Sequence, residues 1–443
     1  MRNDKTTLND LSVFTTDENS SIFSLLNHTT TQAGRNMLRR HIENPPSDYT
    51  QLCQLQDTVK YLGQHTLWPA IVTNGTLVML EKYFDAADIQ TTPPGGMTVL
   101  LGKYFQKLLN KSDYFFTQFS ISHLSDFLKG CKELTGLLGH KQLPQALRTV
   151  LEKMDEELQQ RLVDDIISAN KGTPYRELAM LNYKARRELK NPVQRLMHAY
   201  AMLDAWHAMA MATNTHKWVF PEIVQSTAPV FEIKGLYHPL LAQPVSYEVQ
   251  FSNHRNFMVL TGANMSGKTT FMRALGIAAL LAHIGMGVPA ESMRITFLHG
   301  IITNMHVEDD ILKGESYFFA EVQRMKMTAT QLLQSNTHLV LMDELFKGTN
   351  VHDAYECTRA VIEGLLNHNH HLMVLSTHLY EVAQHFSNNT GIHFAYFVTR
   401  MDDADQFRFT YELKQGISND RIGYRILQNE GVLDLLNKSK RNH

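Results

Sequence analysis

The spacing of hydrophobic residues changes near residue 225 of this 443-residue chain. From about Ile22 onward the apolar residues recur mainly at helical spacing, as in residues 147–154. From about Ala228 onward, short apolar and β-branched runs alternate with helical stretches, as a mainly parallel sheet requires. We therefore predict a multidomain protein with an N-terminal tail over residues 1–20, an all-α domain over residues 21–225 and an α/β domain over residues 226–443.

Residues 262–269 form the most informative motif, because Gly-Ala-Asn-Met-Ser-Gly-Lys-Thr fits the phosphate-binding loop G-x-x-x-x-G-K-[ST]. The apolar run before the loop predicts a buried strand, and the run after it predicts a helix. The glycines let the backbone bend around phosphates, and amides at the helix start point at negative charge. Lys268 would reach the β- and γ-phosphates of ATP, and the Thr269 hydroxyl would bind Mg²⁺. The predicted nucleotide-binding residues are Gly262, Ala263, Asn264, Met265, Ser266, Gly267, Lys268, Thr269 and Thr270.

Two further apolar runs end in polar residues and suit neighbouring strands of the same sheet. Residues 338–342 lead into Asp343 and Glu344, which suits a strand that supplies a metal ligand and an acid to orient or deprotonate water. Residues 372–375 lead to His378, a candidate γ-phosphate sensor at the carboxyl end of a third strand. The alternatives are a strand that simply ends in a polar turn, and a structural or solvated histidine.

The polar segment 308–321 separates the phosphate loop from Asp343 and carries Ser316 just before a helical pattern. A helix start with a free hydroxyl binds anions, and it would be redundant in a subunit that already has a phosphate loop. It makes sense if Ser316 caps the γ-phosphate held by a second subunit, as in ABC-type ATPases. The alternative is an ordinary N-capped helix.

Composition agrees with an intracellular globular protein, with 43% hydrophobic and 19% charged residues. The formal net charge of −2 excludes a globally basic nucleic-acid binder but not a local basic surface. The three widely spaced cysteines suggest neither a disulfide framework nor a cysteine zinc site. We find no signal peptide and no apolar run long enough for a membrane span, so we expect a cytoplasmic protein.

Motifs in both halves of the chain resemble the MutS family of mismatch-repair proteins. In the α/β half they are residues 237–239, 261–270, 285–290, 314–321, 343–350, 376–378 and 416–424. In the helical half they are residues 31–40, 44–46 and 203–210. The resemblance covers about residues 20–440. Within the motifs, Ala263 replaces the usual proline, Ser266 a glycine, and Phe346-Lys347 a Gly-Arg pair, and none of these changes removes a catalytic atom.

The resemblance implies an all-α core and lever domain followed by an ABC-type P-loop ATPase domain with a C-terminal dimerisation segment. It implies ATP and Mg²⁺ as cofactors of a homodimer, in which Glu344 and His378 are catalytic and Thr269 and Asp343 hold the metal. Ser316 would reach the γ-phosphate of the partner subunit. Residues 348–353 would couple the two sites across the dimer.

The resemblance also carries an expected absence. The core-like segment starts near residue 20, so we expect this chain to be a short, divergent MutS-like protein that lacks the mismatch-recognition and connector domains. The basic residues between Lys184 and Arg195 are interpreted as a solvated helix face, because acids such as Glu188 are interspersed.

The leading hypothesis is an ATPase that switches its grip on DNA of unusual structure, through phosphate contacts with little sequence preference. The alternative is an ATP-gated scaffold for a protein or ribonucleoprotein partner that never recognises DNA directly.

Overall fold

The computed structural model describes residues 4–15, 17, 20–86, 111–139, 142–170, 172–226, 228–252, 254–305, 317–334, 336–401 and 407–418, together with 427, 431–432 and 435–436. The chain forms two compact units that alternate along the sequence. The sheet unit comprises Met1–Leu25, Ile42–Cys53 and Thr215–His443, and the helical unit comprises Leu26–His41 and Gln54–Asn214. The sequence predicted three consecutive segments, a tail over residues 1–20, a helical domain over residues 21–225 and an α/β domain over residues 226–443. These domain boundaries remain a prediction.

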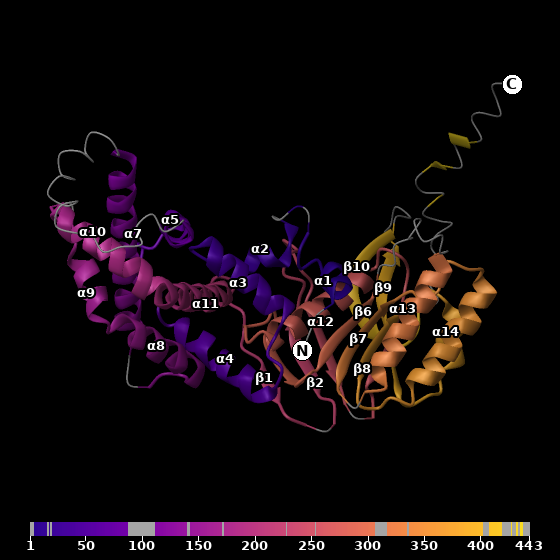
Figure 1. The fold of residues 1–443 in the computed structure, drawn as a ribbon. Coiled ribbons are helices and arrows are strands. Elements are labelled where there is room, and N and C mark those ends of the chain that lie inside the picture. Colours follow the sequence, from indigo (N-terminus) through magenta and orange to yellow (C-terminus); the bar gives the residue numbers. More distant parts are fainter. Residues whose placement is uncertain are drawn as a thin grey trace. The chain divides into compact units, whose positions relative to one another are not determined.

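The described chain from Lys5 to Thr215 is built from helices, and the described strands begin at Glu222 (Figure 1). The mixture of helices with α/β sheets agrees with the predicted fold class. The helices before the first strand are α1 (Lys5–Asp10), α2 (Ile22–Leu26), α3 (Gln32–Glu43), α4 (Tyr49–Leu62), α5 (Asn74–Asp85), α7 (Lys111–Leu138), α8 (Gln145–Leu158), α9 (Arg161–Ser168), α10 (Tyr175–Lys184), the π-helix η2 (Ala185–Leu189) and α11 (Lys190–Thr215). Among the described helices, none is both long and apolar enough to cross a membrane.

Helix α11 is largely buried, with most of its residues from Tyr200 to Thr213 inaccessible to solvent. The Tyr200 hydroxyl accepts a hydrogen bond from Trp68 Nε1 at 3.1 Å, and the imidazole of His207 stacks on the Trp68 ring. A second link joins α11 to α3, because Trp206 Nε1 donates to His41 Nε2 at 3.1 Å. These aromatic groups bury a large area while their polar atoms stay hydrogen-bonded.

A buried carboxylate on α11 fixes the start of α3 within the same unit. Asp204 accepts hydrogen bonds from the backbone N–H and the hydroxyl of both Thr30 and Thr31, over 2.7–3.1 Å. The Thr31 hydroxyl in turn accepts from Gly34 N at 3.0 Å. The first N–H groups of a helix have no intrahelical acceptor, so a carboxylate there satisfies donors and favours the helix dipole.

The sheet unit contains two sheets. The six-stranded sheet has the order β10-β9-β4-β8-β7-β6, in which all neighbours are parallel except the antiparallel pair β9–β10. The four-stranded sheet has the order β1-β5-β2-β3. The strands are β1 (Glu222–Val224), β2 (Phe231–Leu236), β3 (Tyr247–Phe251), β4 (Phe257–Thr261), β5 (Ser292–Thr296), β6 (Gly300–Asn304), β7 (His338–Asp343), β8 (Leu372–Ser376), β9 (Ile392–Met401) and β10 (Phe407–Gln415).

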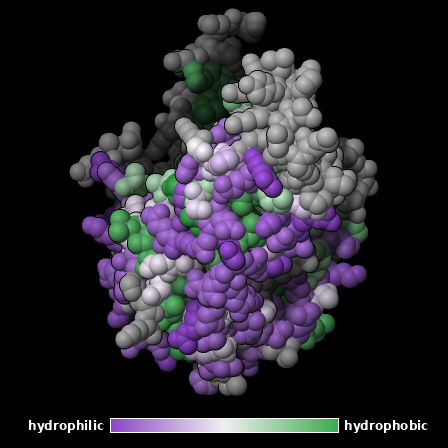
Figure 2. Space-filling model, turned by 60° about the vertical axis from the view of Figure 1, so that its left-hand side comes forward, coloured by the Kyte–Doolittle hydropathy of each residue, from purple (hydrophilic) through white to green (hydrophobic). Residues whose placement is uncertain are grey.

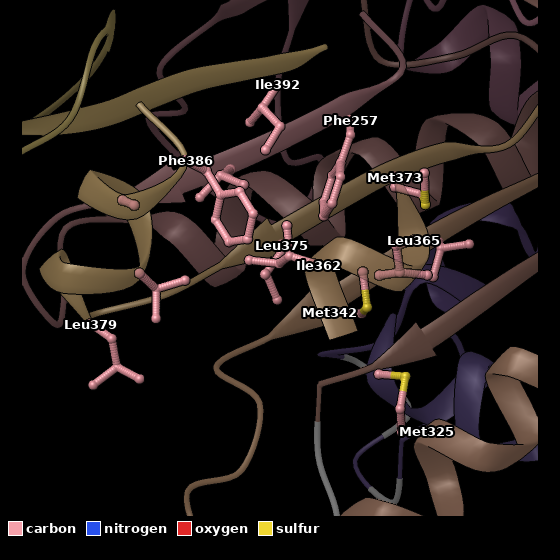
Figure 3. Packing of buried hydrophobic residues seen from close by; sticks show 14 of the residues in the cluster. Phe257, Met325, Met342, Ile362, Leu365, Met373, Leu375, Leu379, Phe386 and Ile392 are labelled. Carbon is pink, nitrogen blue, oxygen red and sulfur yellow. The ribbon is translucent and has the colours of Figure 1, made fainter. Parts of the chain in front are cut away.

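Strands β4, β7 and β8 are buried along their whole length, as expected of parallel strands covered on both faces. Helices α13 (Tyr317–Leu332), α14 (Val351–Leu365) and α15 (Tyr380–His385) supply the apolar side chains that cover one face. Figure 3 shows this packing, in which Phe257, Leu375 and Phe386 gather with Ile362. Helix α12 (Lys268–His283) contacts strands of both sheets and is almost entirely buried.

The segment predicted as an N-terminal tail contains helix α1, which begins after the N-cap Asp4 and contacts β6. Leu8 and Leu11 are buried, as is the carboxylate of Asp10. The hydrophobic spacing from Leu8 to Val13 is too short to reveal a helix by periodicity, because it spans less than two turns.

Candidate active site

The loop between β4 and α12 has the backbone that the phosphate-binding motif requires. Gly262 and Gly267 have φ values of +131° and +107°, which side-chain-bearing residues rarely adopt. Met265 also has a positive φ of 67°, and its side chain is 75% exposed at the tip of the loop beside Asn264. Helix α12 starts directly at Lys268, so its first free N–H groups face the inside of the loop.

Lys268 is folded back against its own loop. Its ammonium donates to the carbonyl oxygens of Gly262 and Ala263 at 2.9 and 3.0 Å, and lies 3.6 Å from Glu344 Oε1. Burial lowers the pKa of Lys268, while the charges of Glu344 and Asp343 oppose that shift. The loop therefore holds a buried cation whose present acceptors are loop carbonyls and one carboxylate, and a phosphate group offers stronger acceptors.

The carboxylate of Asp343, at the end of β7, is positioned from two sides. The Thr269 hydroxyl on α12 donates to Oδ2 at 2.6 Å. Ser376, its register partner at the end of the parallel strand β8, donates a short hydrogen bond to Oδ1. A hydroxyl beside a carboxylate is an oxygen donor set that suits Mg²⁺, so Thr269 and Asp343 fit the metal that the sequence predicts.

Glu344 follows β7 in a left-handed conformation, with φ of +54°, and its N–H donates to Ser376 O at 3.1 Å. Its carboxylate lies 3.3 Å from Lys347 Nζ and 3.7 Å from His378 Nδ1. His378, followed by the Lys347 and Lys268 cations, lowers the pKa of Glu344 to about 2, against the opposing effect of burial. Three cationic or potentially cationic groups thus converge on one ionised carboxylate at the carboxyl edge of the sheet.

The loop that follows Glu344 is held by a residue of α13. Both carboxylate oxygens of the buried Glu321 accept backbone N–H groups, from Lys347 at 3.0 Å and from Gly348 at 3.1 Å. A Cβ at Gly348 would lie 2.6–2.7 Å from atoms of Tyr317 and Phe318, so only glycine fits. The loop then passes into α14, whose N-cap Asn350 accepts from the Asp353 N–H.

The structure brings the phosphate loop, Asp343, Glu344 and His378 together at one edge, where parallel α/β sheets bind ligands. Thr270 lies in the first turn of α12, and Ser266 is buried with no hydrogen-bond partner for its hydroxyl in the described part of the chain. Ser316 lies outside the described residues. The C-terminal dimerisation segment also falls largely outside them.

Sequence reasoning missed three contributors to this site. Ser376 and Glu321 were each part of a quoted motif, but neither had a role, although a hydroxyl opposite Asp343 could have been found from strand register. The third is Tyr411, which occupies a β-bulge in β10 with φ of +55°. Its ring lies so close to the phosphate loop that a Cβ at Gly267 would come within 3.2 Å of it.

A parallel sheet with a glycine-rich loop leading from a buried strand into a helix defines the class of P-loop nucleotide-binding domains. The family comparison agrees. Residues 258–440 match the family model of MutS domain V, and residues 6–212 match that of MutS domain III. The chain therefore belongs to the MutS family, whose domain V is its ATPase domain. Members of this family bind DNA and form dimers.

Proposed function

We propose that this MutS-like protein hydrolyses ATP to ADP and phosphate at the carboxyl edge of the six-stranded sheet. The observation that carries the proposal is the convergence of Lys268 and Thr269 at the start of α12 with Asp343 and Glu344 at the end of β7. The loop amides and Lys268 would bind the phosphates, and Thr269 and Asp343 would hold Mg²⁺. When bound, Mg²⁺ supplies charge neutralisation on the phosphate oxygens.

Glu344 would act on the attacking water, with His378 beside it. A carboxylate with a pKa of about 2 is a weak proton acceptor, so its main contribution would be to accept a hydrogen bond and orient the water. The neighbouring Lys347 and His378 keep Glu344 ionised and fixed in position. We therefore expect no loss of activity from the titration of Glu344 near neutral pH.

We further propose that two copies of the chain complete the site, with Ser316 of one subunit reaching the nucleotide of the other. Large apolar side chains around the site are exposed in the single chain, which supports a partner there. Met265 of the phosphate loop is 75% exposed, Val351 at the start of α14 is 72% exposed and Phe319 in α13 is 44% exposed. Exposed large apolar side chains near a functional site are a feature of many protein interfaces.

The DNA-binding part of the proposal rests on the family, whose members bind DNA. In the helical unit, most of the basic residues singled out from the sequence already contact protein groups. Arg186 stacks on Tyr83 and donates to Ala86 O, Lys190 donates to Phe84 O, and Arg195 pairs with Glu157 at 2.6 Å. The face of the molecule shown in Figure 2 is mostly hydrophilic, with scattered apolar side chains.

Because these basic side chains already bind protein groups, they favour the second candidate function, an ATP-gated scaffold for a protein or ribonucleoprotein partner. Both candidates use the same ATPase, so the motifs do not separate them. The cytoplasmic location also stays a prediction from the sequence.

The test compares Lys268→Ala, Glu344→Gln and the surface control Glu363→Gln. We expect Lys268→Ala to weaken ATP binding itself. Glu344→Gln should keep nucleotide binding and lose about 10²–10⁴-fold in hydrolysis rate, as for removal of a catalytic carboxylate. Hydrolysis by Glu344→Gln at the wild-type rate would remove Glu344 from the mechanism.

The same Glu344→Gln protein separates the two candidate functions. It is titrated against homoduplex, mismatched, branched and single-stranded DNA with ATP or ADP, across a salt series. Nucleotide-dependent binding with a steep salt dependence supports the DNA switch. Weak binding that is equal across the panel and insensitive to nucleotide supports the scaffold.

A further inference from the structure

Helix α1 lies against β6, the edge strand of the six-stranded sheet, although nearly 300 residues separate them. Thr7 donates from its hydroxyl to Ile301 O at 3.3 Å, and the Thr303 hydroxyl lies 3.4 Å from that of Thr7. The covering of β6 by α1 shields a sheet edge that would otherwise be open.

Asp10 makes the strongest of these contacts. Its carboxylate is only 2% exposed, and its Oδ2 accepts from the Thr303 hydroxyl at 2.6 Å and from Met305 N at 3.1 Å. Charge-assisted hydrogen bonds of this kind are stronger than neutral ones and fix geometry. Asp10 therefore fixes the carboxyl end of β6 at two points.

The same segment touches two helices of the sheet unit. Asp4 Oδ2 accepts from Arg324 of α13 at 3.2 Å, and Arg324 also donates to Thr303 O at 2.8 Å. The buried Leu11 lies beside Gly276 of α12, where a Cβ would come within 2.5 Å of the leucine side chain. Residues 4–11 thus link β6 to α13 and to the helix that follows the phosphate loop.

The end of β6 is part of the candidate active site. Asn304 and Met305 line the small hollow that also contains Asp343, Glu344 and Lys347. A residue that holds Met305 in place therefore acts on the lining of the hollow that contains the catalytic carboxylate. Asp10 itself is not in the hollow, so any effect on the reaction must pass through β6.

We propose that residues 4–11, here called the N-terminal clasp, are a positioning element of the ATPase site, with Asp10 as the residue that sets the end of β6. The proposal rests on the ATPase function proposed above. It assigns to the first described residues a role in turnover that is separate from nucleotide binding, because the hydrogen bonds of the clasp described above go to the end of β6 and to α13, and the phosphate loop is not among their partners.

The experiment measures kcat and KM for ATP hydrolysis, the affinity for a fluorescent ADP analogue, and the melting temperature of the full chain. Asp10→Ala should lower kcat by about 10-fold or more, since misplacement by about 1 Å costs up to 10²-fold. Its affinity for the ADP analogue should stay within about 2-fold of wild type, because binding uses the loop and α12. Asn9→Ala, an exposed neighbour on α1, is the matched control and should behave as wild type.

Two further variants keep the test decisive. Asp10→Asn retains a carbonyl oxygen that accepts from Thr303 and Met305, so it should recover most of the lost kcat. Thr303→Val keeps the strand and removes one donor, so it should lower kcat in the same direction with a native-like melting temperature.

The outcomes are distinguishable. If wild type hydrolyses ATP and Asp10→Ala does so equally well, the clasp proposal fails and the ATPase proposal stands. If Asp10→Ala loses nucleotide affinity and kcat together, and Asp10→Asn rescues neither, Asp10 only maintains the fold and the clasp proposal fails. If wild type binds nucleotide without hydrolysing it, both proposals fail.

Discussion

The contact between Gly34 and Asp204 predicts that a helix-favouring substitution will destabilise the protein. Alanine stabilises helices relative to glycine by up to about 1 kcal/mol, so propensity alone predicts that Gly34→Ala strengthens α3. The structure predicts the opposite, because a Cβ at Gly34 would lie 2.1 Å from Asp204 Oδ2. Asp204 is fully buried and holds four hydrogen bonds to Thr30 and Thr31.

The size of the destabilisation follows from the hydrogen bonds that Asp204 loses when its carboxylate moves away from the added Cβ. Hydrogen bonds to a charged group contribute about 1.5–3 kcal/mol each, so the loss of two costs about 3–6 kcal/mol. After the propensity gain, we expect Gly34→Ala to reduce the free energy of unfolding by about 2–5 kcal/mol. That is a large part of the ~5–15 kcal/mol typical of a folded domain.

Urea denaturation followed by tryptophan fluorescence measures this loss. Two of the three tryptophans, Trp68 and Trp206, belong to the helical unit and report on it. With an m-value of about 2 kcal/mol/M, a loss of 3 kcal/mol lowers the midpoint by about 1.5 M. Gly136→Ala is the matched control, because Gly136 lies in α7 with open space where a Cβ would be added, and it should raise the midpoint slightly. A midpoint for Gly34→Ala at or above wild type would refute the reasoning.

Two other predictions concern metal and acid. Ser376→Ala removes a hydrogen bond that orients Asp343, so the Mg²⁺ concentration for half-maximal ATP hydrolysis should rise about 10–100-fold, as is usual for partners of metal ligands. Thr358→Val, which removes a buried hydroxyl that has no hydrogen-bond partner among the described residues, should leave that concentration unchanged. Burial lowers the pKa of His283 and of His371 to about 4. One ring nitrogen of each histidine accepts a hydrogen bond from a backbone N–H, and protonation of that nitrogen would break this hydrogen bond. In the unfolded state the pKa of each histidine is about 6.5. The free energy of unfolding should therefore be constant above pH 6.5, and between pH 6.5 and 4 each histidine should lower it by about 1 kcal/mol for every pH unit. An unfolding midpoint that stays constant from pH 7.5 to 5 would contradict this linkage.

The chemistry of the site was accessible from sequence because it depends on local order. A strand, a glycine-rich loop and a helix are consecutive in the chain, and Lys268 and Thr269 take their positions from that order alone. The parallel arrangement of β4, β7 and β8 then brings Asp343 and Glu344 to the same edge. What the sequence alone left undetermined are the contacts that depend on register and packing, such as the hydrogen bond from Ser376 and the ring of Tyr411 beside Gly267.

In the helical half, too, the sequence did not predict which segments contact each other. Residues 31–40 and 203–210 were both noticed as parts of a resemblance, but nothing in their spacing indicates that they meet. The structure joins them through Asp204, Thr30 and Thr31. Long-range hydrogen bonds leave no periodic signal in a single sequence, and α1 was predicted as part of a tail for the same reason.

The distance along the chain between Asp10 and Thr303 has a consequence for biosynthesis. The two residues are 293 positions apart and pair directly. At about 5–20 residues per second, roughly 15–60 s of translation separates them. The first helix of the sheet unit therefore leaves the ribosome long before the strand that it covers exists. During that interval Asp10 lacks its partners Thr303 and Met305, and Leu11 lacks its packing against Gly276 of α12, so the native contacts of α1 with the sheet form only late in synthesis.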